Sequence, residues 1–116
     1  MTAWISYENG ATLGLKGSEG GAIIRDHEHE GGARITLEQD TLRGVPFAIT
    51  CGVYGWLVHT RFFADEPTAL QEYERMQGAL EAILKLLPDE RMSDDESARA
   101  ADTAADAVTA FVEQYP

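Results

Sequence analysis

The sequence predicts an α+β fold, in which an antiparallel sheet of about six strands in residues 1–64 is followed by two helices in residues 65–116. Ten of the eleven glycines lie at or before Gly55, and glycine supplies the positive φ angles that tight turns between short strands require. After Phe63, by contrast, apolar residues recur at helical spacing. Because the strands precede the helices, we expect both helices to pack on one face of a meander of hairpins. A length of 116 residues fits a single domain spanning 1–116.

The first four strands are predicted from turn signals and alternation. The pair Asn9-Gly10 favours a type I′ turn, which predicts a hairpin between strands at 4–8 and 11–16. Glycine-rich breaks then separate strands at 22–28 and 33–39. In the fourth strand apolar and polar residues alternate, as expected for a sheet with one buried face.

The fifth and sixth strands, at 47–51 and 56–63, are apolar on both faces and carry the densest aromatic group of the chain. A single layer of helices covers only one face of such a hairpin, so the second face predicts self-association as a homodimer. The group also has the composition of a core or of a ligand cavity, and these alternatives stay open. As an interaction surface the sequence points to Tyr54, Trp56 and Phe62 within the cluster Phe47, Tyr54, Trp56, Phe62 and Phe63.

Two helices follow, each with an N-terminal signal. Asp65 is the expected N-cap of the first helix, and Pro88 is expected to end it. Ser93 and Glu96 form a capping-box pattern at the start of the second helix. The apolar stripe of the first helix consists of Leu70, Tyr73, Met76, Leu80, Ile83, Leu84 and Leu87.

The formal net charge of −11 is concentrated in the helical half. Residues 65–116 carry 13 acidic and 4 basic side chains, whereas residues 1–64 carry 7 and 5. Binding to a nucleic-acid backbone or to an anionic membrane surface is disfavoured, because both need clustered Lys or Arg. The acidic half is either a solvated surface or the binding face for a basic protein partner.

The stretch 26–30 alternates carboxylates with His27 and His29, which would project from one face of a strand. Two imidazoles at this spacing can share a metal ion if a third ligand is present, and His59 and Glu38 are the candidates. The alternative is a solvated hairpin tip. If the carboxylates surround the two imidazoles, they are expected to raise the pKa of both histidines.

Two further patterns have both a chemical and a purely structural interpretation. Cys51 would face His59 across the hairpin, as a catalytic Cys/His pair requires, but a free cysteine is more often a buried core residue. The glycine-rich segment 14–21 lacks the Lys-Ser/Thr ending of a phosphate-binding loop and precedes a strand rather than a helix, so turn chemistry explains it.

No pattern in the sequence identifies a cofactor or a complete catalytic set. The preferred hypothesis is therefore a non-enzymatic binding module that acts as a homodimer. The first alternative is an acidic inhibitor of a basic partner, of the immunity or antitoxin kind, and the second is a small metal-dependent enzyme using His27 and His29. The single cysteine and the absence of a secretory signal pattern lead us to expect a cytoplasmic protein.

Overall fold

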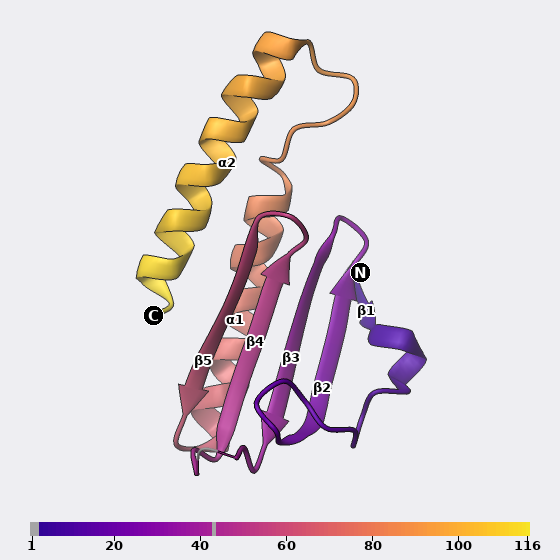
Figure 1. Cartoon of the computed structure of the whole chain (residues 1–116), viewed down its shortest axis with the longest axis vertical. Helices are drawn as coiled ribbons and strands as arrows, with labels where there is room; N and C mark the ends of the chain where they lie inside the picture. Colours follow the sequence, from indigo (N-terminus) through magenta and orange to yellow (C-terminus); the bar gives the residue numbers. More distant parts are fainter. Residues whose placement is uncertain (1–2, 43) are drawn as a thin grey trace.

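The computed structural model describes residues 3–42 and 44–116, which form an antiparallel sheet followed by two helices (Figure 1). The strands are β1 (Trp4–Ser6), β2 (Ala22–His29), β3 (Ala33–Gln39), β4 (Phe47–Val53) and β5 (Leu57–Phe63). They pair in sequence order, so the sheet is a five-stranded meander within the described residues. The helices are α1 (Glu66–Leu84) and α2 (Asp94–Gln114). The predicted α+β order is confirmed.

The predicted count of about six strands is one too high, because the first hairpin does not form. Trp4–Ser6 pairs instead with the far end of β2, where Trp4 lies opposite His29. The Asn9-Gly10 pair does adopt the expected positive φ angles, 56° and 86°, but inside a 3₁₀ turn at Tyr7–Gly10. Residues 11–16 then form turns, with one isolated bridge from Lys16 to Ala22. The turn at Asn9-Gly10 was therefore predicted correctly, and the strand that follows it was not.

Helix α1 covers one face of the sheet and completes the core. Its buried residues recur every three or four positions, and they lie on the side chains that β3 and β4 project toward the helix. Among the fully buried side chains are Ile35, Leu37 and Ile49 from the strands and Met76 and Leu80 from α1. Asp65 caps α1 as predicted, since its carboxylate accepts a hydrogen bond from the Thr68 N–H at 2.9 Å.

Helix α2 lies beside the sheet rather than across it (Figure 1). The predicted capping box is present, because Ser93 and Glu96 each accept a hydrogen bond from the other's backbone N–H. Only Ala104 and Phe111 of this helix are buried. Phe111 and the following Tyr115 join the core next to β5, where His59 meets the ring of Phe111 edge-on. The prediction that both helices pack on one face of the sheet therefore describes α1 better than α2.

Candidate interaction surface

The sheet face that points away from α1 is divided into a covered half and an exposed half. Residues 7–21, which we call the strap, run along the edge of the sheet beside β1 and β2 and then loop across the lower ends of β2 and β3 (Figure 1). Two buried carboxylates under the strap, Asp26 and Glu38, are 3% and 1% exposed. The strap is therefore bound to the sheet by polar contacts, and the part of the face over β4 and β5 is left open.

Asp26 is the centre of the first contact. Its carboxylate accepts hydrogen bonds from the hydroxyls of Thr12 and Thr36 and from Nε and one terminal nitrogen of Arg34, at 2.7–3.1 Å. Burial acts to raise the pKa of Asp26, but the hydrogen bonds from Arg34, Thr12 and Thr36 outweigh it and hold this pKa below its ordinary value. The guanidinium of Arg34 also stacks on the ring of Tyr7, 3.6 Å from its centroid. Two strap residues, Thr12 and Tyr7, are thus fixed to one ion pair.

Glu38 makes the second contact. Its carboxylate accepts hydrogen bonds from the backbone N–H groups of Glu19 and Gly21, the latter at 2.8 Å. A side chain at Gly17 would place its Cβ 2.5 Å from the same carboxylate, so a larger residue there would displace Glu38 from its hydrogen bonds with the strap. The N–H groups of this glycine-rich segment are thus directed at the chain's own carboxylate, and turn chemistry accounts for the segment as the sequence indicated.

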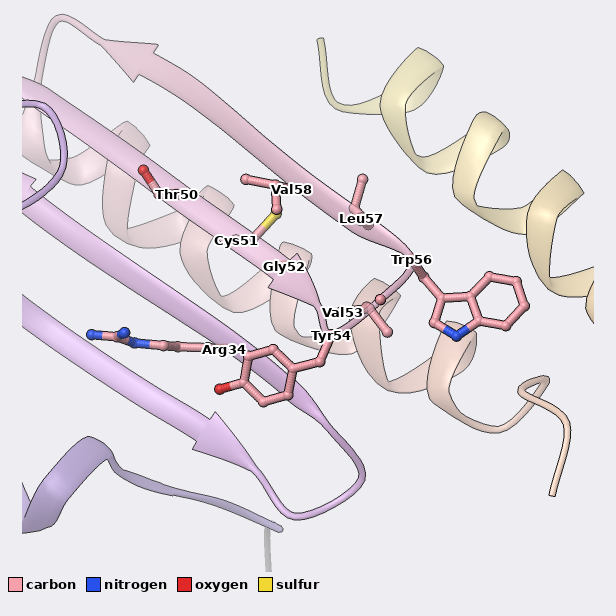
Figure 2. A pocket seen from close by; sticks show the side chains of 10 residues that line it. Arg34, Thr50, Cys51, Gly52, Val53, Tyr54, Trp56, Leu57 and Val58 are labelled. Atoms are coloured by element: carbon pink, nitrogen blue, oxygen red, sulfur yellow. The ribbon is translucent and has the colours of Figure 1, made fainter. Parts of the chain in front are cut away.

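The exposed half, which we call the β4–β5 face, consists of Thr50, Gly52, Tyr54, Val58, Thr60 and Phe62. Tyr54, Val58 and Phe62 are 55%, 84% and 40% exposed. A shallow depression of about 480 Å³ lies between Tyr54, Arg34 and Val58, with Gly52 as its floor (Figure 2). In the described part of the chain, large apolar side chains this exposed, on adjacent strands beside a depression, are typical of an interaction surface.

The structure separates the aromatic group that the sequence had placed together. Tyr54 and Phe62 lie on the β4–β5 face, whereas the indole of Trp56 points toward α2, although Trp56 is also among the residues that line the depression (Figure 2). Trp56 and Phe47 pack against the core and Phe63 is buried within it. Val58, the most exposed of the large apolar residues described, was absent from the predicted surface although its alternation with Leu57 was visible in the sequence.

The three histidines lie in different environments. His27 faces α1, where its Nδ1 lies 2.7 Å from the hydroxyl of Tyr73. That hydroxyl donates its proton to the carbonyl of Ile35, so the Nδ1–H of His27 is the donor in their shared bond. Burial lowers the pKa of His27, although Asp26 acts to raise it, so the expected increase in pKa is wrong for this residue.

His29 packs edge-on against Trp4, and His59 bonds through Nε2 to the carbonyl of Tyr115. Glu38, the other proposed ligand, is bound to the strap on the opposite face of the sheet. Among residues 3–42 and 44–116, no group of three or more His, Cys, Asp or Glu side chains is arranged to hold a metal ion.

Cys51 and His59 are register partners on β4 and β5, as the sequence indicated. Cys51 is nevertheless 2% exposed, and burial raises the pKa of its thiol to about 12. A nucleophilic cysteine requires the opposite shift, because the thiolate is the reactive form. The environment of Cys51 is that of a core residue.

Comparisons of the chain with protein-family models, with curated proteins and with solved structures found no match. Within its described residues, neither helix combines the length and the apolar character needed to cross a membrane.

Proposed function

We propose that this chain is a non-enzymatic interaction module that associates with a second copy of itself through the β4–β5 face. The observation that supports the proposal is the exposure of Tyr54, Val58 and Phe62 together, on the sheet face that α1 does not cover. Burial of one such side chain contributes about 1.5–3 kcal/mol.

The charge distribution allows a second copy to occupy this face. Two chains of net charge −11 repel each other, and 13 of the 20 acidic residues lie in residues 65–116. The six residues that define the β4–β5 face are all uncharged. Contact through this face keeps the acidic helices of the two copies away from the interface. Six residues define the face, against roughly 20–30 residues per partner in a standard interface, so we expect a dimer that dissociates on dilution.

The proposal is tested by sedimentation equilibrium. Protein concentrations of about 1–200 micromolar cover about two decades and span moderate affinities. The expected mass at the upper end is twice the 12.7 kDa of the chain. Val58→Lys introduces a charge at the centre of the face and should weaken the dimer at least tenfold, roughly the loss of one buried valine. Leu42→Lys is the matched control, since Leu42 is 77% exposed and lies outside the face. A monomeric wild type, or equal weakening by both variants, would overturn the proposal.

A second candidate function is the acidic inhibitor of a basic protein, supported by a different surface. Between α1 and α2 lies an apolar groove of about 320 Å³, lined among others by Ala82, Leu86 and Ala110. The helices around it hold most of the excess negative charge. Such a complex gains much of its association rate from charge, so it should weaken steeply between 50 mM and 500 mM salt, where screening lengths fall from about 14 Å to about 4 Å. Capture of a basic partner that is unchanged by salt would exclude this function.

A further inference from the structure

The β4–β5 face has a ridge on one strand and a furrow on the next. Val58 and Gly52 are register partners, so the most exposed large side chain of the face stands directly beside its only glycine. A Cβ at position 52 would lie 2.9 Å from the backbone carbonyl of Leu57, which explains why glycine occupies this position and leaves the floor of the depression bare. Ridge and furrow lie side by side on the same copy, as a self-complementary surface requires.

The strap restricts how two copies can face each other. Its Ser18 hydroxyl lies 3.3 Å from that of Thr50, so the strap rises above the surface next to β4. A two-fold axis running across the strands would place the two straps on top of each other. A two-fold axis parallel to the strands, between β4 and β5, instead places β5 of each copy over β4 of the other. Each strap then lies beyond the partner's β5. Within one copy the strap and α2 lie toward opposite ends of the sheet (Figure 1).

Resting on the proposed dimer, we infer that Val58 of each copy inserts into the depression over Gly52 of the other copy, with the two-fold axis parallel to the strands. Gly52 and Val58 are at the same level of the ladder, so an axis between β4 and β5 exchanges their positions. Each inserted valine meets Tyr54 and Arg34, which line the depression (Figure 2). Because Thr50 and Thr60 are also register partners, the same axis places Thr60 of each copy over Thr50 of the other. The bare backbone at Gly52 allows the two sheets to approach closely at this point.

A charge-complementation experiment tests this pairing. Val58→Lys places an ammonium in the partner's depression beside Arg34, and Tyr54→Glu places a carboxylate on the wall of the depression. Each variant alone is expected to dimerise at least tenfold more weakly than the wild type. When the two are mixed, the introduced ammonium of one chain meets the introduced carboxylate of the other, while the second depression keeps its original residues. Native mass spectrometry should then show a heterodimer, with a dissociation constant within about threefold of the wild-type value, a difference of under 1 kcal/mol.

Leu42→Glu provides the matched control, because it adds the same negative charge as Tyr54→Glu but outside the face. Mixed with Val58→Lys it should give no gain over Val58→Lys alone. Val58→Lys and Tyr54→Glu must each melt within a few degrees of the wild type. A mixture of Val58→Trp and Tyr54→Ala repeats the complementation test with side-chain size in place of charge. Failure of both mixtures while the single variants stay weakened would overturn the pairing and leave the dimer face intact. A monomeric wild type would overturn both.

Discussion

Replacing Asp26 by Asn should destabilise the fold strongly, although the change replaces one oxygen by an NH₂ group. In the native protein the carboxylate accepts four hydrogen bonds, two of them from Arg34. The amide oxygen of Asn retains part of this set, but the amide nitrogen faces a guanidinium nitrogen that also can only donate. The loss of one charge-assisted bond and the weakening of a second, each worth about 1.5–3 kcal/mol, gives a cost of about 3 kcal/mol.

Urea denaturation followed by circular dichroism measures this cost. With a slope of about 1.5 kcal/mol per molar urea, the midpoint should fall by roughly 2 M. Glu28→Gln is the matched control, since Glu28 lies on the same strand and face and accepts a hydrogen bond of 2.6 Å from the exposed Tyr54 hydroxyl. That substitution should cost under about 1 kcal/mol.

The pH dependence gives an independent check. The native pKa of Asp26 lies below its ordinary value of 3.8, so folding favours the ionised form. The contribution of Asp26 is therefore complete above the unfolded pKa and is lost as the pH falls through the native pKa. The stability gap between wild type and Asp26→Asn should be constant from pH 7 to about pH 5 and shrink below about pH 4. A gap that matches that of Glu28→Gln, or that persists unchanged to about pH 2.5, would refute the reasoning.

Two more outcomes follow from individual side chains. Burial raises the pKa of Cys51 to about 12, so in the native protein the thiol should react with a disulfide reagent at about pH 8 no faster than the protein unfolds. In urea the same reaction should be rapid. Immediate reaction of the native protein would contradict the burial of Cys51. Burial lowers the pKa of His27 below its ordinary value of 6.5, so native stability should decline as the pH falls below 6.5. NMR should show His27 titrating below the free value, and a higher value would contradict the burial of its imidazole.

Much of the fold was predictable because the relevant signals are local. The caps at Asp65 and Ser93 involve residues three positions apart, and the helical stripe of α1 repeats within one element. The turn between β4 and β5 also lies where glycine indicated it. Each of these features depends on a few neighbouring residues, so no knowledge of the tertiary arrangement is needed.

The segment 7–21 was mispredicted because its structure depends on distant partners. The turn at Asn9-Gly10 is compatible with a two-residue hairpin, but Trp4 gains burial by pairing at His29 instead. The strap is then held by two distant carboxylates. Asp26 lies 14 positions after Thr12, and Glu38 lies 17 positions after Gly21. In sequence these acids look like ordinary exposed residues of alternating strands. Their burial became visible only with the strap in place.

The same long-range contacts determine which part of the sheet is available for binding. A strand pattern identifies two faces but does not say where a loop will cover one of them. Here the acids of β2 and β3 bind the backbone and hydroxyls of the strap, whereas β4 and β5 present Thr50, Gly52 and Val58, which offer no such acceptor carboxylate. The polar half of the face is consequently covered from within the chain, and the apolar half is left exposed. This division explains why Val58, inconspicuous in the sequence, becomes the centre of the proposed interface while Trp56 does not.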